Sequence, residues 1–275
     1  MHELEKTIKY QGAKTRLDHL VRDLCGCGLR RAKTLISEGR VYIDGYKSIK
    51  QAKSIFPGQV IAFDFPEVKR NFSPGLYLVR RKGFWAAIYK PPGVHSDQGK
   101  DPVDAATLLP TFFEDKIDAI LLNRLDQHTS GLLTVGLSSE AKNIYSRAQE
   151  AGSIQKKYVA LVHGIIDEQI VASKYIDHAR RRKVKVLNFA DRDTLRHTWI
   201  FPVKTTGDKT LLRVLIKKGK RHQIRAHLSS IGHPIVGDAL YGGANSEQSF
   251  LYLHHESIEW PDFKAECPAP WKDQI

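Results

Sequence analysis

The sequence predicts a protein of helices and strands in two parts: a small unit of two helices and a hairpin, followed by a larger domain rich in strands. Three observations lead to this prediction: apolar residues at helical spacing between Leu17 and Ile36, a linker-like segment from Pro66 to Gly75, and strand-like apolar runs beyond it. We therefore expect a first domain at residues 1–67, a linker at 68–75 and a second domain at 76–275.

The chain is strongly basic. Its 275 residues include 43 Lys and Arg against 30 Asp and Glu, a formal charge of +13. Such a field attracts polyanions, and nucleic acid is the preferred partner because no polybasic amphipathic helix or lipidation signal supports a membrane. No run is long enough to span a bilayer, so we expect a cytoplasmic protein. The cysteines match neither a disulfide framework nor a zinc pattern and are interpreted as reduced thiols: Cys25, Cys27 and Cys267.

Two helices open the first domain. Apolar residues recur at i, i+3, i+4 and i+7 in the first, which ends near Gly26 and Gly28: Leu17, Leu20, Val21 and Leu24. In the second helix Ala32, Leu35 and Ile36 form the buried stripe, and Gly39 ends it. Basic residues project from the opposite side, answered only by Glu38, which predicts a face of a single sign. Val41 and Ile43 then alternate as a strand before Asp44-Gly45, a strong hairpin signal.

This stretch, from about Thr15 to Phe65, resembles the S-four RNA-binding domain. The resemblance rests on Thr15-Arg16-Leu17-Asp18, on Arg30-Arg31-Ala32-Lys33 leading to Leu35-Ile36-Ser37-Glu38-Gly39-Arg40-Val41, and on the Asp44-Gly45 turn. It implies an accessory domain that binds RNA, without implying a reaction. The RNA-binding residues expected in it are Arg16, Arg30, Arg31, Lys33 and Arg40.

The second domain is predicted to consist mostly of strands. The expected strands lie at 85–89, 132–137, 156–164 and 211–217, with a helix-like segment through Leu108 and Leu109, a helix capped by Ser138, and another beginning at Ile224. The cationic side of the last strand continues into Lys218, Lys220, Arg221 and Arg225 with no acid between them. A second basic cluster is Arg180-Arg181-Arg182-Lys183, which suits either phosphate contacts or a mobile loop. The spacing of His222, His227 and His233 matches no metal-binding pattern.

A single carboxylate stands out in the stretch from Asn123 to Gly131. Asp126 lies between Arg124 and a turn at Thr129-Ser130-Gly131, directly before a strand. By itself this stretch fits a loop whose Asp bonds its own backbone. Tyr158, in turn, fits an aromatic at the edge of a core.

Three blocks together resemble the RluA-type pseudouridine synthases. They are Arg124-Leu125-Asp126-Gln127-His128-Thr129-Ser130-Gly131-Leu132, then Lys157-Tyr158-Val159-Ala160, then Gly219-Lys220-Arg221-His222-Gln223-Ile224-Arg225-Ala226-His227-Leu228 with Gly232-His233-Pro234-Ile235 and Gly237-Asp238-Ala239-Leu240-Tyr241-Gly242. The sequence departs from the family at Asn123, where His is usual, and at Lys220-Arg221. These departures concern substrate choice or rate and leave the carboxylate untouched.

The resemblance implies isomerisation of a uridine in RNA to pseudouridine, with Asp126 as the catalytic carboxylate and no metal or other cofactor. Asp126 either adds to the anomeric carbon or takes a proton from the ribose, and the sequence leaves both routes open. By the same carry-over, Arg225 lies beside Asp126 and keeps it ionised, Tyr158 stacks on the displaced base and helps remove its proton, and Ile224 forms an apolar wall. Arg124 holds a phosphate or the space left by the flipped nucleotide, while Lys220 and Arg221 bind RNA. The implied α+β fold is a mixed, largely antiparallel sheet with the active cleft across its middle.

Two other classes stay open: a hydrolase that releases uracil, and a non-catalytic RNA-binding or ribosome-assembly protein. A hydrolase would normally need a second carboxylate, and the sequence offers none near the Asp126 motif. The expected partner is structured RNA, ribosomal RNA before transfer RNA, and the protein is expected to be a monomer.

Overall fold

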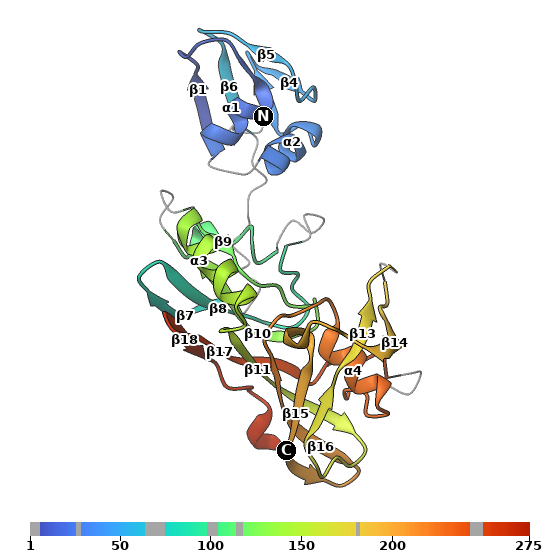
Figure 1. Cartoon of the computed structure of the whole chain (residues 1–275). Coiled ribbons are helices and arrows are strands. Elements are labelled where there is room, and N and C mark those ends of the chain that lie inside the picture. Colours follow the sequence, from blue (N-terminus) through green and yellow to red (C-terminus); the bar gives the residue numbers. More distant parts are fainter. Residues whose placement is uncertain are drawn as a thin grey trace. The chain divides into compact units, whose positions relative to one another are not determined.

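The computed structural model of the chain divides into two compact units, Met1–Phe72 and Ser73–Ile275 (Figure 1). It describes residues 6–25, 29–63, 75–97, 104–113, 118–179, 182–242 and 250–275. The predicted linker at 68–75 falls almost entirely outside these ranges, as do Gly26, Cys27, Gly28, Arg180 and Arg181. Among the described residues, no helix is both long and apolar enough to cross a bilayer.

The first unit packs two helices against small antiparallel sheets. Its elements are β1 (Lys6–Lys9), β2 (Thr15–Arg16), α1 (Leu17–Cys25), α2 (Leu29–Ser37), β3 (Val41–Ile43), β4 (Tyr46–Ser48), β5 (Ser54–Ile55) and β6 (Val60–Phe63). The main sheet has the order β1-β6-β3-β4, and β2 pairs with β5. Asp44 and Gly45 join β3 to β4 with φ of 52° and 84°, as the predicted two-residue hairpin turn requires.

A buried carboxylate corrects the predicted charge pattern of this unit. Asp18 is fully buried and accepts two hydrogen bonds from the Arg16 guanidinium, at 3.0 and 2.8 Å. The Nζ of Lys33 lies 3.9 Å from the same carboxylate. The expectation that Glu38 alone answers the basic residues is therefore wrong, because the packing of α1 against α2 brings Asp18 to them. Arg40 lies half-buried between α2 and β3, and the side chains of Arg30 and Arg31 fall outside the described part of the structure.

The second unit is built on one large sheet with the order β12-β15-β16-β11-β17-β10-β8-β7, to which β18 and β9 add at β17 and β10. Its strands are β7 (Tyr77–Lys82), β8 (Trp85–Lys90), β9 (Ile120–Leu121), β10 (Ser130–Gly136), β11 (Gln155–His163), β12 (Ile170–Ala172), β15 (Thr198–Thr206), β16 (Lys209–Ile216), β17 (Leu253–Trp260) and β18 (Phe263–Glu266). Among the described strands β10 and β17 are the parallel pair, and the other pairings are antiparallel. The expected mixed, largely antiparallel sheet is confirmed.

Both faces of this sheet are covered at β10, which explains why this strand shows no alternation of apolar and polar residues. All seven residues of β10 are buried. Leu133 and Val135 belong to the larger core, together with Tyr158, Ala160 and Val162 of β11, whereas Leu132 faces a second core. The remaining elements are helices α3 (Ser139–Glu150) and α4 (Gln223–Ser230), the two-stranded ribbon of β13 (Lys174–Asp177) and β14 (Lys185–Ala190), and 3₁₀ turns at Leu109–Thr111, Thr194–Arg196 and Lys272–Gln274.

Helix boundaries follow the expected signals with one exception. The Ser138 side chain accepts a hydrogen bond from the backbone N–H of Ala141 and caps α3, as predicted. The helix-like segment at Leu108 and Leu109 is only a 3₁₀ turn, Leu109–Thr111, with Pro110 in its first turn.

Candidate active site

The loop that carries Asp126 lies between β9 and β10 and is held on both sides of the carboxylate. The Ser96 hydroxyl donates to the carbonyl of Leu125 and accepts from its N–H, at 2.9 and 3.0 Å. On the other side, the Nζ of Lys90 donates to the carbonyl of Gln127 at 3.0 Å and to two further backbone carbonyls. Lys90 is fully buried, and burial lowers its pKa to about 7. These hydrogen bonds fix the backbone from which Asp126 projects.

Asn123, one of the departures from the family pattern, has a structural role in the same loop. Its Oδ1 accepts the backbone N–H of Thr134 at 2.6 Å, and its Nδ2 donates to the carbonyl of Leu132 at 3.4 Å. An amide supplies both an acceptor and a donor, so Asn123 ties the approach to Asp126 onto β10.

Arg225 joins Asp126 to a second carboxylate. It projects from the first turn of α4 with 7 % exposure, and its Nη1 donates to Asp126 Oδ2 at 3.0 Å. Its Nε and Nη2 donate to the two oxygens of Asp238, both at 2.8 Å. The contact of Arg225 with Asp126 that the resemblance implied is therefore present, and the bidentate pair with Asp238 sets the plane of the guanidinium.

Asp238 is a neighbour of this site that sequence reasoning missed, and the expectation that no second carboxylate lies near the motif is wrong. The side chain is buried, and its Oδ1 also accepts the backbone N–H groups of Leu240 and Tyr241, both at 3.0 Å. Burial acts to raise the pKa of Asp238, but the Arg225 hydrogen bonds outweigh it and the net shift is downward. These donors hold both carboxylate oxygens still, so Asp238 orients Arg225.

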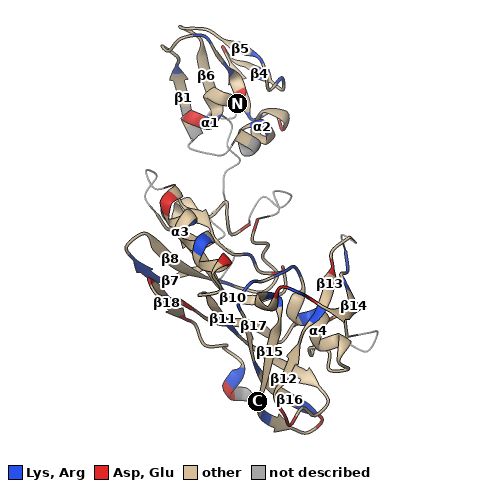
Figure 2. Ribbon diagram, in the orientation of Figure 1, with Lys and Arg blue, Asp and Glu red and all other residues tan. Residues whose placement is uncertain are grey.

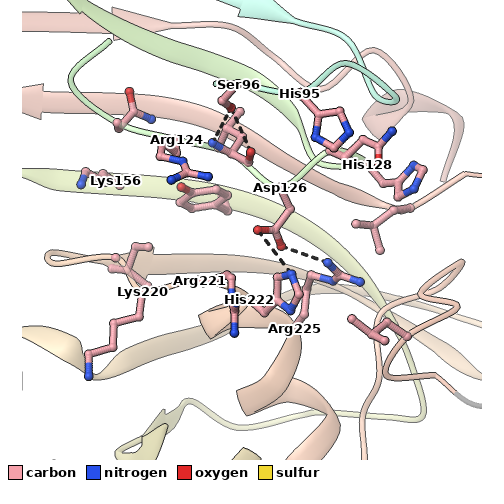
Figure 3. Close-up of a pocket in the computed structure, with 18 of the residues that line it drawn as sticks. His95, Ser96, Arg124, Asp126, His128, Lys156, Lys220, Arg221, His222 and Arg225 are labelled. Carbon is pink, nitrogen blue, oxygen red and sulfur yellow. Dashed lines mark hydrogen bonds and ion pairs between the residues drawn. The ribbon is translucent and has the colours of Figure 1, made fainter. Parts of the chain in front are cut away.

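Asp126 faces a cavity of about 1060 Å³ (Figure 3). Figure 3 places Arg124 and Lys156 toward one end of this cavity and His95 and His128 toward the other, with Asp126 between them. Its apolar lining comes from Leu122, Leu125, Ile216, Leu240 and Leu251. The implied role of Ile224 as an apolar wall is not seen, because this side chain is 5 % exposed in the core and is not among the lining residues.

Tyr158 lies on the cavity and is supported from behind by a histidine. Its ring is 6 % exposed and stacks on His255, with centroids 4.5 Å apart and planes 17° from parallel. Burial raises the pKa of Tyr158 and lowers that of His255 to about 3, so both rings are neutral at pH 7. Tyr158 is therefore more than an aromatic at the edge of a core, since it presents a fixed, neutral ring to the cavity.

Cations surround the cavity, although several have partners that the sequence did not reveal. Arg124 is largely exposed, and its Nε pairs with Asp97 Oδ1 at 2.8 Å. Lys156 is 4 % exposed and donates to Gln149 Oε1 at 2.9 Å, and its burial lowers its pKa to about 8. Lys220 and Arg221 line the cavity as well.

The predicted acid-free cationic side of β16 needs correction. Lys218 pairs with Glu150 at 2.6 Å and lies 3.8 Å from Asp193, so folding brings acids from α3 and from the turn before β15 to it. Figure 2 shows Lys and Arg on α4 and on the β13–β14 ribbon beside it.

The three histidines of this region have structural partners. His222 Nδ1 is 3.1 Å from the Tyr241 hydroxyl, and its Nε2 is 3.9 Å from Asp126 Oδ1. His227 bonds the Thr198 hydroxyl and the carbonyl of Lys174, both at 2.8 Å, while His233 bonds the carbonyl of His163. Across the described ranges, no group of three His, Cys, Asp or Glu side chains is placed to hold a metal ion.

Comparison with known proteins gives the same result at three levels. Residues 85–230 match the family described as RNA pseudouridylate synthase. An uncharacterized RNA pseudouridine synthase of Helicobacter pylori is 31% identical over 273 residues, covering 99% of this chain and 100% of the relative. Ribosomal large subunit pseudouridine synthase D of Yersinia pestis is 28% identical over 257 residues, covering 88% of this chain and 77% of the relative. The structure of human RNA pseudouridylate synthase domain containing 1 shares the fold, with a TM-score of 0.61 and 23% identity over 72% of this chain and 84% of that one.

The matched family and the mixed sheet define the class of this protein as an isomerase that acts on RNA. The chain belongs to the RNA pseudouridylate synthase family and is an RNA pseudouridine synthase of the RluA type. This class sets aside the hydrolase and the non-catalytic RNA-binding protein.

Proposed function

We propose that this enzyme isomerises specific uridines of structured ribosomal RNA, with Asp126 as its catalytic carboxylate. The observation that carries the assignment of Asp126 is its position: it faces the cavity and accepts a hydrogen bond from Arg225, which Asp238 in turn holds in place. The Yersinia pestis relative, whose name gives the large ribosomal subunit as its substrate, supports ribosomal RNA. The net charge of +13 suits any large RNA.

The two oxygens of Asp126 have different surroundings. Arg225 occupies Oδ2, whereas His222 Nε2 is 3.9 Å from Oδ1, beyond hydrogen-bonding distance. We assign Oδ1 to the substrate. In the reaction the bond from C1′ to N1 of uracil breaks, the ring turns, C5 bonds to C1′, the C5 proton leaves, and N1 takes up a proton, so that nothing is gained or lost overall. Oδ1 either adds to C1′ or takes a ribose proton, and either step requires the fixed direction that Arg225 provides.

Tyr158 is assigned to the uracil ring as a packing surface. Its raised pKa makes the phenolate a costly species at pH 7, which argues against its removing the C5 proton. A neutral ring stacked on His255 is instead held rigidly, so it limits how the detached uracil turns.

The remaining predicted residues are assigned to RNA binding. Extruding a uridine from a stem costs a few kcal/mol, which phosphate contacts offset. Arg124, Lys220 and Arg221 lie at the cavity and suit this role. We also infer that the first unit is an RNA-binding domain of the S-four type, supported by its two helices and hairpin and by the exposed part of Arg16 and Lys33.

The test compares RNA from cells without this protein with RNA from the same cells carrying the wild type or Asp126→Asn. We expect pseudouridine to disappear from one or more ribosomal RNA positions, to return with the wild type, and to stay absent with Asp126→Asn, which keeps the shape but lacks the second oxygen. The purified variant should fold and bind RNA nearly as the wild type does. Sites missing from transfer RNA instead would change the assigned substrate, and normal product from Asp126→Asn would remove this residue from the mechanism.

A further inference from the structure

The β13–β14 ribbon carries an aromatic pair on the face that it turns away from the core. Ile176 and Val184 pack against Ala226 of α4 and Tyr241. Residues alternate between the two faces of a strand, so Tyr175 is on the opposite face from Ile176. There it stacks on Phe189, with ring centroids 5.3 Å apart and planes 19° from parallel, and Phe189 is 57 % exposed. The stacked pair therefore presents an aromatic surface to solvent.

Cations connect this aromatic surface to the catalytic cavity. The Nζ of Lys220 lies 5.0 Å from the centre of the Tyr175 ring, and Lys220 also lines the cavity that contains Asp126. Lys185 is exposed on β14, and Arg182 lines the cavity from the loop between the two strands. An exposed aromatic pair with a cation against one ring, beside a cavity lined by further cations, is the chemistry that binds an unpaired base and its phosphates.

Hydrogen bonds hold the ribbon to the wall of the cavity. His227 of α4 donates from Nε2 to the carbonyl of Lys174 at 2.8 Å. The Tyr241 hydroxyl accepts the backbone N–H of Val184 at 3.0 Å and is 3.1 Å from His222 Nδ1. These bonds fix the ribbon to α4, the helix that carries Arg225.

We propose that Phe189, backed by Tyr175, is a stacking site for an unpaired base of the substrate RNA that flanks the target uridine. When the uridine leaves its helix, a neighbouring base loses a stacking partner, and an aromatic ring replaces it without regard to base identity. The proposal rests on the RNA substrate proposed above but not on ribosomal RNA in particular. The alternative that the experiments must distinguish is a structural role, in which the two rings only stabilise the two-stranded ribbon.

The first measurement needs no knowledge of the natural substrate. A short single-stranded RNA with 2-aminopurine next to one uridine is titrated with wild type, Phe189→Leu, Phe189→Trp and Phe84→Leu. Phe84 is a matched control, since it is 60 % exposed in the turn between β7 and β8. We expect wild type, Phe189→Trp and Phe84→Leu to quench the fluorescence by stacking, and Phe189→Leu to lose the quenching and to bind about tenfold more weakly.

The second measurement is a double-mutant cycle that combines a change in the protein with a change in the RNA, on a ribosomal RNA fragment that the wild type modifies. Nucleotides flanking the target are replaced one at a time by abasic ribose. For the wild type, one such replacement should raise KM by about tenfold; for Phe189→Leu, KM should already be raised and the same replacement should add nothing, with kcat unchanged in saturating RNA.

The stacking site would be overturned if each abasic replacement raised KM by the same factor in wild type and in Phe189→Leu. It would also be overturned if Phe189→Leu quenched the 2-aminopurine fluorescence as strongly as the wild type. If Phe189→Trp lost the quenching as Phe189→Leu does, the aromatic pair would serve only to stabilise the ribbon, and the proposal would be overturned as well. A wild type that modifies no ribosomal RNA fragment counts against the proposed substrate alone, since the 2-aminopurine titration still reports the stacking.

Discussion

At the scale of single residues, the site depends on Arg225 holding two carboxylates at once. Its Nη1 binds Asp126, and its other two nitrogens bind the buried Asp238. Burial by itself lowers the pKa of Arg225, but the hydrogen bonds and charges of Asp238 and Asp126 outweigh it and raise the pKa. The guanidinium is therefore charged at any working pH. Because Asp238 fixes the guanidinium, the guanidinium in turn fixes the orientation of Asp126.

Arg225→Ala should lower kcat by much more than about tenfold, which is roughly 1.4 kcal/mol of barrier. Asp126 would lose its partner and direction, and Asp238 would remain buried without its counterion. The measurement is single-turnover conversion, with Arg213→Ala, an exposed arginine of β16, as the control. An Arg225→Ala enzyme within about tenfold of wild type would show that the pairing is unimportant for the reaction.

His255 should make the stability of the second unit depend on pH. Its folded pKa of about 3 lies below its unfolded value of about 6.5, so the unfolded state binds one more proton between these values. Stability is fully present above about pH 6.5 and falls by about 1.4 kcal/mol per unit as the pH drops toward 3. Denaturant unfolding followed by tryptophan fluorescence measures this, because all four tryptophans lie in the second unit: Trp85, Trp199, Trp260 and Trp271.

The control for this pH dependence is His255→Gln, for which the slope between pH 4 and 6 should decrease by about 1.4 kcal/mol per unit whatever its absolute stability. Other buried histidines contribute equally to both proteins. Identical slopes would mean that His255 is protonated in the folded state.

At the scale of elements, the site depends on how β10 starts. Gly131 follows the Asp126 loop, pairs in parallel with His255 of β17 and has φ of 111°. A Cβ at this position would collide with the backbone carbonyl of His255 and lie 2.6 Å from its nitrogen. The close approach of β10 to β17 therefore requires glycine here.

Gly131→Ala should destabilise the second unit by more than about 3 kcal/mol, since backbone strain adds to a collision with backbone that cannot move aside. The matched control is Gly207→Ala in the turn between β15 and β16, where φ is also positive, at 58°, but nothing lies within 4 Å of the added Cβ. It should cost only about 1 to 2 kcal/mol. Equal losses in the two variants, measured by denaturant unfolding, would mean that contact with β17 is not what restricts this position.

At the scale of the whole molecule, substrate binding and chemistry are expected to separate between the two units. All residues assigned to the reaction lie in the second unit, whereas Lys33 and Arg40 lie in the first. Because Asp18 already pairs with Arg16 and Lys33, fewer cations of the first unit are available to phosphates than the sequence suggested.

Deletion of residues 1–75 should raise KM on structured RNA more than it slows turnover of bound substrate. The salt dependence of binding should also flatten, by about 0.7 to 0.9 in log affinity per log salt for each phosphate that the shortened protein no longer neutralises. Turnover at saturating RNA checks that the remaining unit is intact. A shortened protein with unchanged affinity and salt slope would show that the first unit has some other partner.

Much of this molecule was predictable because short sequence patterns indicate which residues belong to the same helix or strand. The period of Leu17, Leu20 and Val21 indicated α1, and the run after Ser130 indicated β10, a strand buried on both faces. The motif that contains Asp126 and the one that contains Arg225 were recognisable for the same reason, as each is a contiguous stretch of chain.

Partnerships between distant residues were not predictable in this way. Arg225 and Asp126 are 99 positions apart, and no periodicity indicates that Asp238 would take the other side of the guanidinium. Other contacts likewise arise only when separate elements pack together. They are the bond from Lys90 to the Gln127 carbonyl, the contacts of Asp18 with Lys33 and of Glu150 with Lys218, and the burial of Ile224. A local pattern specifies which face of an element is apolar, whereas the neighbour of a charged side chain depends on which face of another element meets it, and that is set by the packing of the whole unit.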